Sequence, residues 1–315
     1  MYYFIVNPKS RTGLGAQVWQ DVQAEIKSRR LSYQAFLTEY RGHATKLTRQ
    51  ICQKSRGDFL IVIGGDGTLQ EVLSGFQASS DITLGYIPAG SGNDFARSMK
   101  IPRDPLSALK LILSSPPAIS MDVGVLKSGN RKGAFGISCG MGFDAAICHA
   151  ALSSRLKNLL NRIHLGKLTY AFLALRLLFA FRPFTLELTL DGQQQTFEQV
   201  YFVAVMNQPY EGGGFLFCPD ARPDDRLLDV LVIHQMSKLK LLLCLPTAFW
   251  GKHTHFKGVQ LLQGRNILLK SSRIVPIHQD GESAGIGDSL EAGLGEAQIP
   301  ILAGSRLSET HAQLP

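Results

Sequence analysis

The sequence predicts an α/β domain with a doubly wound sheet, followed by a mostly antiparallel β-sandwich domain. One observation is an alternation of short apolar runs with helical patterns over about the first 120 residues, which is typical of a parallel sheet. A second is the change, after Ser115-Pro116-Pro117, to longer strand-like runs joined by turns. A third is a pair of glycine-rich turns, each of which follows a predicted strand.

The first domain is expected to span residues 1–122. Its predicted strands cover 2–6, 33–39, 59–65 and 82–89, and its predicted helices cover about 14–30, 44–54, 69–76, 94–99 and 106–113. In sheets of this kind ligands bind beyond the carboxyl ends of the strands. The turns that follow these strands are therefore where a site is expected.

The second domain is expected to span residues 123–289, with a tail of about 290–315 that packs back on the first domain. Strand-like runs cover 119–126, 133–143, 184–192, 199–208, 227–234 and 265–272, interrupted by helical patterns at about 151–163 and 165–181. The segment 165–181 is shorter than the roughly 20 apolar residues of a membrane span and carries two charges. We expect no transmembrane span, but a helix packed on a sheet or lying against a bilayer, where nearby basic side chains meet anionic headgroups (Arg155, Lys157, Arg162, Lys167).

Composition restricts the compartment and the partner. The 315 residues carry 33 Lys plus Arg against 25 Asp plus Glu, a net charge of +8, which favours an anionic partner such as a nucleotide, nucleic acid or acidic lipid. The five cysteines form no Cys-x-x-Cys pair, so a reducing cytosol fits best, and the first residues resemble a strand rather than a secretory signal. No nucleic-acid recognition motif occurs, so a nucleic-acid partner is not expected.

The first glycine turn, Gly64-Gly65-Asp66-Gly67-Thr68, follows an apolar strand and precedes a helix. Backbone N–H groups and the helix dipole at such a turn favour an anion, and phosphate is the usual guest. Asp66 would repel a bare phosphate, so we expect it to bind a hydroxyl, a magnesium ion through water, or a basic side chain. The alternative is a tight turn stabilised by the Asp66 side chain.

A second turn repeats this pattern one strand later. Residues 87–97 read IPAGSGNDFAR, with glycines on either side of Ser91 and a helix expected to start at Asn93-Asp94. Two glycine turns at the ends of neighbouring strands favour a phosphate site over simple turns. The sequence has neither a GxxxxGK[ST] motif nor the motifs of protein kinases, and Gly13-Leu14-Gly15 does not complete a dinucleotide-binding pattern.

These turns resemble the diacylglycerol kinase catalytic domain family, which includes bacterial lipid kinases and sphingosine kinases and is related to NAD kinases and phosphofructokinases. The further segments that carry the resemblance occur in the family's order and cover nearly the whole chain: NPKSRTG from Asn7, LTEYRGHA from Leu37, MDVG from Met121, GGGFLFCPDARPDDRLLDV from Gly212 and QDGE from Gln279. The resemblance implies a first domain similar to phosphofructokinase and NAD kinase.

The resemblance also implies roles for individual residues. ATP phosphates would be held by Gly64, Gly65, Gly67 and Thr68, with contacts from Asn7, Thr38 and Ser91, and the ATP-binding set would extend to Asp66, Leu69, Gln70 and Asn93. Glu282 would act as the base that takes the proton from the acceptor hydroxyl, with Asp66 as the other candidate for this role.

A structural magnesium ion is implied as well. Its ligands would be the backbone oxygens of Arg222 and Leu227 and the carboxylate of Asp225. Asp94, Asp122 and Asp225 would form a carboxylate and water network behind the catalytic metal. This chain departs from the family at Arg226 and Arg11, where glycine is usual, so the turn at Arg226 must avoid positive φ or be strained.

The expected function is that of an ATP- and Mg²⁺-dependent kinase that phosphorylates the hydroxyl of diacylglycerol or a related lipid. The expected location is the cytoplasm, peripheral to an anionic inner membrane face. Alternatives are a kinase of sphingoid bases or other lipid alcohols, a soluble-substrate kinase similar to NAD kinase, and a catalytically silent nucleotide-binding regulator. The oligomeric state stays open, a dimer included.

Overall fold

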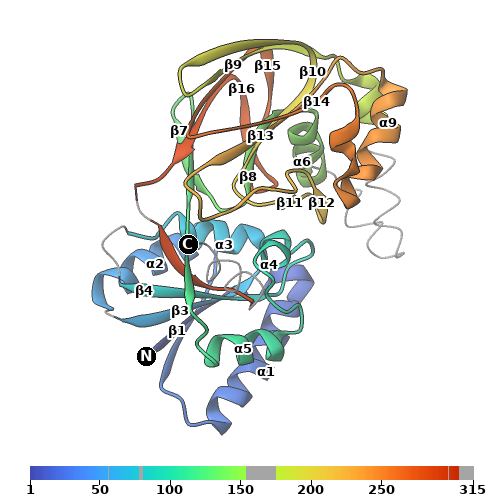
Figure 1. The fold of residues 1–315 in the computed structure, drawn as a ribbon. Coiled ribbons are helices and arrows are strands. Elements are labelled where there is room, and N and C mark those ends of the chain that lie inside the picture. The colour runs from blue at the N-terminus through green and yellow to red at the C-terminus, as the bar shows by residue number, and fades with distance from the viewer. Residues whose placement is uncertain (56, 78–80, 154–174, 297, 305–315) are drawn as a thin grey trace.

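The structure, a computed structural model, describes residues 1–315 except 56, 78–80, 154–174, 297 and 305–315. It contains an α/β domain and a β domain, stacked one on the other (Figure 1). This confirms the predicted fold class. Each domain buries its own apolar cores.

The first domain contains a six-stranded sheet in the order β2-β1-β3-β4-β17-β5. The first five strands in this order pair in parallel, and β5 is antiparallel to β17. The central strand β3 is a continuous apolar run with buried side chains, as expected of a strand covered by helices on both faces. The strands are β1 (Tyr2–Val6), β2 (Tyr33–Leu37), β3 (Asp58–Gly64), β4 (Ile82–Pro88), β5 (Ala118–Met121) and β17 (Ile299–Leu302). The helices are η1 (Ser10–Gly13), α1 (Leu14–Ser28), α2 (His43–Lys54), α3 (Asp66–Leu73), α4 (Asp94–Ser98) and α5 (Pro105–Leu113).

The second domain is built on a nine-stranded sheet in which every pairing between described strands is antiparallel. Alternate residues of β10 face opposite cores: Val203 and Val205 lie in one, and Phe202 and Ala204 in the other. The sheet strands are β6 (Gly124–Ser128), β7 (Arg131–Phe135), β8 (Ser138–Gly142), β9 (Phe184–Leu190), β10 (Gln193–Met206), β13 (Leu228–His234), β14 (Val259–Gly264), β15 (Asn266–Gln279) and β16 (Glu282–Leu294). The remaining elements are the hairpin β11 (Tyr210–Glu211) and β12 (Phe215–Leu216), α6 (Phe143–Ser153), α9 (Lys238–Thr247), η2 (Ala248–Trp250) and η3 (Lys252–His255).

The chain passes between the domains twice. The first crossing joins β5 to β6 at Asp122 and Val123, and the second joins β16 to β17, so that a strand near the C-terminus lies inside the first sheet, between β4 and β5 (Figure 1). The two sheets are therefore tied together at one edge.

Several predicted boundaries were wrong. The helix expected at 69–76 begins three residues earlier, at Asp66, and ends at Leu73. The strand expected over 119–126 is divided between β5 and β6, which belong to different sheets, and the one expected over 133–143 forms β7 and β8. The sequence reading missed β14, β16 and α9.

Two predicted helices fall largely on undescribed residues. Most of 151–163 and of 165–181 lies outside the described ranges, although residues 175–180 are helical. Within the described ranges no helix has the length and apolar character needed to cross a bilayer.

Candidate active site

A cavity of about 550 Å³ lies at the carboxyl ends of β1, β2 and β3. Parallel strands end at the same edge of a sheet, so the turns that follow them meet there. One lining residue, Glu282, comes from the second domain. The others are Asn7, Lys9, Ser10, Arg11, Thr38, Glu39, Tyr40, Arg41, Gly65, Gly67, Thr68, Gln70, Glu71 and Gly90.

The two glycine turns pack backbone against backbone. A Cβ atom on Gly90 would lie 2.6 Å from the Cα of Gly65, and one on Gly64 would lie 2.7 Å from the Cβ of Thr68. A side chain on Gly90 would therefore force the two turns apart, and one on Gly64 would displace Thr68 within the first turn. Asn7 ties the first strand end to the first turn, because its Nδ2 donates to Thr68 Oγ1 at 2.9 Å.

The hydrogen bonds of Asp66 explain why a carboxylate lies among the glycines. Its two oxygens accept the backbone N–H groups of Asp94 and Phe95, each at 3.3 Å, at the start of α4. The sequence indicated a hydroxyl, a metal or a basic side chain as the partner, whereas the structure shows backbone donors. Burial, followed by the charge of Asp94, raises the pKa of Asp66 to about 7.

Asp94 links the first domain to a glycine turn of the second. Arg97 Nη1 donates to Asp94 Oδ1 at 2.8 Å, and the backbone N–H of Gly213 donates to Oδ2 at 2.6 Å. Burial raises the pKa of Asp94, although these donors and the charge of Arg97 oppose the rise. Gly213 and Gly214 have φ of +85° and +122°, which favours glycine at both positions.

Glu282 reaches the cavity from the turn between β15 and β16. Asp280 and Gly281 form this turn, with φ of +48° and +74°. The buried carboxylate of Asp280 holds it in place by accepting three backbone N–H groups at 2.8–3.0 Å, those of Gly136, Ile137 and Ser138. Burial raises the pKa of Asp280 to about 6.

The Glu282 carboxylate faces the first glycine turn. A Cβ on Gly67 would lie 3.7 Å from Oε1, and Arg41 Nη2 lies 3.6 Å from Oε2. The Glu282 side chain is 38% exposed, so a ligand in the cavity can reach it. A carboxylate of the second domain thus meets the glycine turns of the first.

The structure brings together seven of the residues predicted for catalysis and nucleotide binding in this cavity: Asn7, Thr38, Gly65, Gly67, Thr68, Gln70 and Glu282. The other predicted residues support it or lie apart. Gly64 packs under Thr68, Leu69 is in the core, and Ser91 is exposed. Asn93 closes the second turn through both its amide atoms, which bond the backbone of Gly90.

The sequence reading missed the cations of the cavity. Lys9 and Arg11 follow β1, and Arg41 follows β2, all at the carboxyl edge of the sheet. The signal was present in the sequence, because basic residues just after parallel strands lie where a polyphosphate would bind.

A second group that the sequence reading missed lies in the second domain. His278 is fully buried, with Nε2 at 2.9 Å from Asp144 Oδ2 and Nδ1 at 3.2 Å from Glu211 Oε1. Burial alone would lower the pKa of His278, but Glu211 and Asp144 raise it to about 9. Burial raises the pKa of Glu211 to about 7. The three residues lie on separate elements, so no local pattern marked them.

This cluster predicts loss of stability at alkaline pH. The folded pKa of His278 lies above its unfolded value of 6.5, so its contribution is full below pH 6.5 and is lost as pH rises through 9. The loss should be about 3 kcal/mol in the free energy of unfolding. Urea unfolding at several pH values measures it, and the loss should be absent in His278→Gln but present in the exposed-histidine control His255→Gln. Equal pH dependence in His278→Gln and wild type would contradict it.

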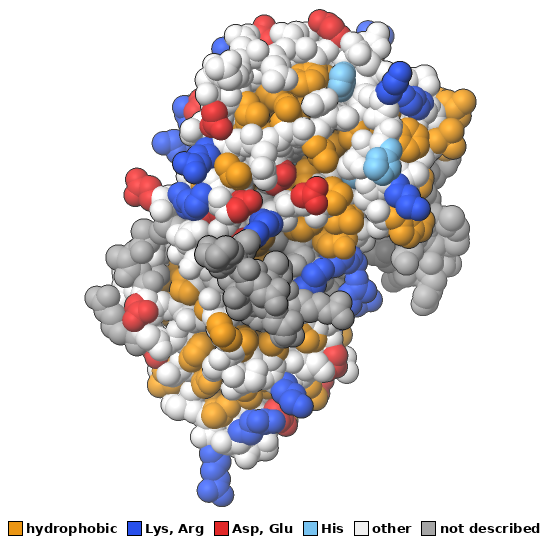
Figure 2. All heavy atoms as spheres, in the orientation of Figure 1, with side chains coloured by type: hydrophobic (Ala, Val, Ile, Leu, Met, Phe, Trp, Pro, Cys, Tyr) orange, Lys and Arg blue, Asp and Glu red, His pale blue; other side chains and the backbone are white. Residues whose placement is uncertain are grey.

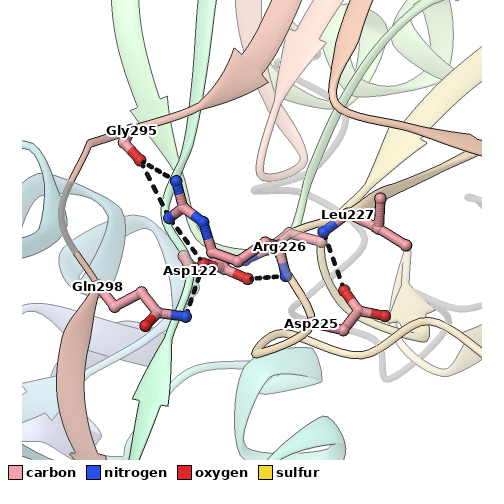
Figure 3. A network of polar contacts seen from close by, with 7 residues as sticks. Asp122, Asp225, Arg226, Leu227, Gly295 and Gln298 are labelled. Carbon is pink, nitrogen blue, oxygen red and sulfur yellow. Dashed lines mark hydrogen bonds and ion pairs between the residues drawn. The ribbon is translucent and has the colours of Figure 1, made fainter. Parts of the chain in front are cut away.

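Two of the residues predicted to hold a structural magnesium ion, Asp225 and Leu227, lie beside Asp122 of the first crossing between the domains (Figure 3). The backbone N–H of Leu227 donates to Asp225 Oδ1 at 3.0 Å. Arg226 adopts φ of +62° and donates to Asp122 twice, from its backbone N at 2.8 Å and from Nη1 at 3.0 Å. The Asp122 carboxylate is thus bonded to a backbone N–H and to a guanidinium.

Two family models match the sequence. One, described as the diacylglycerol kinase catalytic domain, matches residues 1–126, and the other, described as the YegS C-terminal NAD kinase beta sandwich-like domain, matches residues 138–291. Among curated proteins, "Putative lipid kinase YtlR" of Bacillus subtilis is 34% identical over 90% of this chain and 94% of its own length. A "Diacylglycerol kinase" of Mycobacterium tuberculosis is 28% identical over 89% of this chain and 88% of its own.

Solved structures show the same fold. A crystal structure described as a putative diacylglycerol kinase from Bacillus anthracis superposes with a TM-score of 0.77 at 24% identity, covering 97% of this chain and 98% of that one. An NAD kinase from Archaeoglobus fulgidus, solved in complex with ATP, superposes with a TM-score of 0.56 at 10% identity, covering 98% and 96% of the two chains. Both similarities concern the fold alone.

Proposed function

Because this chain belongs to the diacylglycerol kinase family of lipid kinases, we propose that it transfers the γ-phosphate of ATP to the hydroxyl of diacylglycerol or a related lipid. The observation that carries the proposal is the position of Glu282, which enters the cavity from the second domain and faces the glycine turn of the first. A nucleotide and an acceptor bound in this cavity would thus meet beside a carboxylate.

In this proposal ATP is held by the glycine turns and by the basic side chains that follow β1 and β2. Backbone N–H groups near Gly65 and Gly67 favour phosphate, and Lys9 and Arg41 supply positive charge. Glu282 accepts the proton of the acceptor hydroxyl as that oxygen attacks the γ-phosphorus. In-line transfer depends mainly on positioning and charge neutralisation.

The Mg²⁺ that accompanies ATP would be held by Asp66 and Asp94. Their Oδ2 atoms face a common space, since a Cβ on Gly92 would lie 3.4 Å from one and 3.5 Å from the other. The negative charge of Asp94 repels that of Asp66 and so helps to raise the pKa of Asp66, and a bound cation would offset this repulsion. The ion would neutralise charge on the phosphate oxygens.

The acceptor would be drawn from an anionic membrane, at the cytoplasmic face. Asp and Glu are absent from residues 230–279, which contain seven Lys and Arg. In the same stretch Leu239, Leu243 and Trp250 are 67%, 63% and 70% exposed. Figure 2 shows hydrophobic and basic side chains together at the end of the second domain that carries α9. Such a surface suits headgroups and the acyl boundary.

Transfer of labelled γ-phosphate from ATP and Mg²⁺ tests the proposal. Dispersed diacylglycerol, monoacylglycerol, sphingosine and ceramide, and soluble NAD, would be offered separately. We expect labelled diacylglycerol or a related glycerolipid, and no product from the Asp66→Asn variant. Label in sphingosine would support the sphingoid-base alternative, label in NADP the soluble-substrate alternative, and tight ATP binding without turnover a silent regulator; each would overturn the proposal.

A further inference from the structure

Arg226 lies where the two crossings between the domains meet. Asp122 belongs to the first crossing, and Gly295 and Gln298 belong to the second (Figure 3). The guanidinium of Arg226, which comes from the second domain, contacts both: Nη1 donates to Asp122 Oδ1 at 3.0 Å, and Nη1 and Nη2 donate to the Gly295 carbonyl oxygen at 3.2 Å.

We propose that the Arg226 guanidinium is the resident cation of this junction, and that the junction keeps its shape without a divalent metal ion. The Asp122 side chain is 0% exposed, and a buried carboxylate requires a counter-charge and donors. Arg226 supplies both, because its guanidinium is positive and its backbone N–H occupies the second oxygen.

The Asp122 carboxylate already has donors on both of its oxygens. Asp122 Oδ1 accepts Gln298 Nε2 at 3.0 Å as well as Arg226, so neither oxygen of this carboxylate is without an N–H donor. Asp225 Oδ1 accepts the N–H of Leu227. Since Arg226 compensates the charge of Asp122, this carboxylate needs no metal ion as its counter-charge.

The backbone at Arg226 supports the same conclusion. Its φ of +62° lies in the left-handed region, where glycine is unstrained and an arginine is not. A glycine would relieve this strain but would carry no charge. The contacts of the guanidinium with Asp122 and Gly295 therefore offset the strain.

The junction has a bearing on the site, because it sets how the domains lie relative to one another. Asp122 directly follows β5 of the first sheet, and Arg226 lies two residues before β13 of the second. Glu282 is carried by the second domain and the glycine turns by the first. Arg226 is thus a positioning residue.

Thermal unfolding without nucleotide tests the proposal, in excess EDTA and in millimolar MgCl₂. For the wild type we expect a Tm that is the same in the two buffers within about 1 °C. Arg226→Asn removes the charge with a residue that tolerates the left-handed region. We expect its Tm in EDTA to be lower by about 5–10 °C, as for a buried ion pair that has lost one partner.

Arg222→Asn is the matched control, because it removes an arginine of the same loop whose partner is Asp224; its Tm should change by no more than about 2 °C. The proposal is overturned if MgCl₂ raises the wild-type Tm saturably and Asp225→Asn abolishes that rise. A Tm of Arg226→Asn equal to that of Arg222→Asn would overturn it too. If Arg226→Asn does not fold, the wild-type and Asp225→Asn measurements still decide between the two cations.

Discussion

Replacement of Glu282 with glutamine is expected to lower kcat for lipid phosphorylation about 10²- to 10⁴-fold, the range for loss of a general base. Glutamine keeps the shape of the side chain but cannot accept the proton of the acceptor hydroxyl. The KM for ATP should change little, because the nucleotide contacts come from the first domain. Steady-state kinetics over a range of ATP and lipid concentrations separates the two parameters.

Glu291→Gln is the matched control for this variant. Glu291 lies on the same strand, is 54% exposed, pairs with Lys127 and is not among the residues that line the cavity. It should keep wild-type kcat. If Glu282→Gln also keeps wild-type kcat, Glu282 is not the base.

Replacement of Asp280 with alanine is expected to lower the free energy of unfolding by about 3–5 kcal/mol. Three buried backbone N–H groups would lose their acceptor, and an unsatisfied buried donor costs about 1–3 kcal/mol. The sum is reduced because water can enter near the turn. Urea unfolding at neutral pH measures the loss, since the pKa of Asp280 is about 6 and the carboxylate is then mainly ionised.

Asp288→Ala provides the comparison, because Asp288 is an exposed acid on β16, the strand that follows the turn of Asp280. Its substitution should change the free energy of unfolding by less than about 0.5 kcal/mol. A loss below about 1 kcal/mol in Asp280→Ala would show that the three N–H groups find other acceptors. The milder Asp280→Asn keeps one acceptor oxygen and should stay folded.

The first domain could be predicted closely because its signals are local. Buried parallel strands are continuous apolar runs, and the runs ending at Val6, Gly64 and Pro88 could be recognised without knowing their neighbours. The junction at Asp122 could not be predicted from the sequence. The run through residues 119–126 continues in sequence, but the backbone N–H of Asp122 leaves the sheet to bond the carbonyl of Pro223, a contact about 100 residues away. β16 was missed because its glycines and acids weaken the strand pattern, and its partners β15 and β6 fix it.

The same distinction holds for the candidate site. The glycine turns are visible because a strand, glycines and a helix are adjacent in sequence. The partners of Asp66 are 28 and 29 residues away, so its role at the start of α4 depends on how two strands pair. The cluster around His278 needs three elements of the second domain together, and no periodicity encodes that contact.

The place of β17 has a consequence for the order in which the chain can fold. Among the described strands of the first sheet, β5 pairs only with β17, and β17 also covers the edge of β4. During synthesis the residues of β1 to β5 therefore emerge with β5 unpaired and with β4 presenting an open edge, which is a template for association with other chains. The sheet closes only when Leu302 has been made, after the whole second domain. The amino-terminal domain is thus the first to be started and the last to be completed.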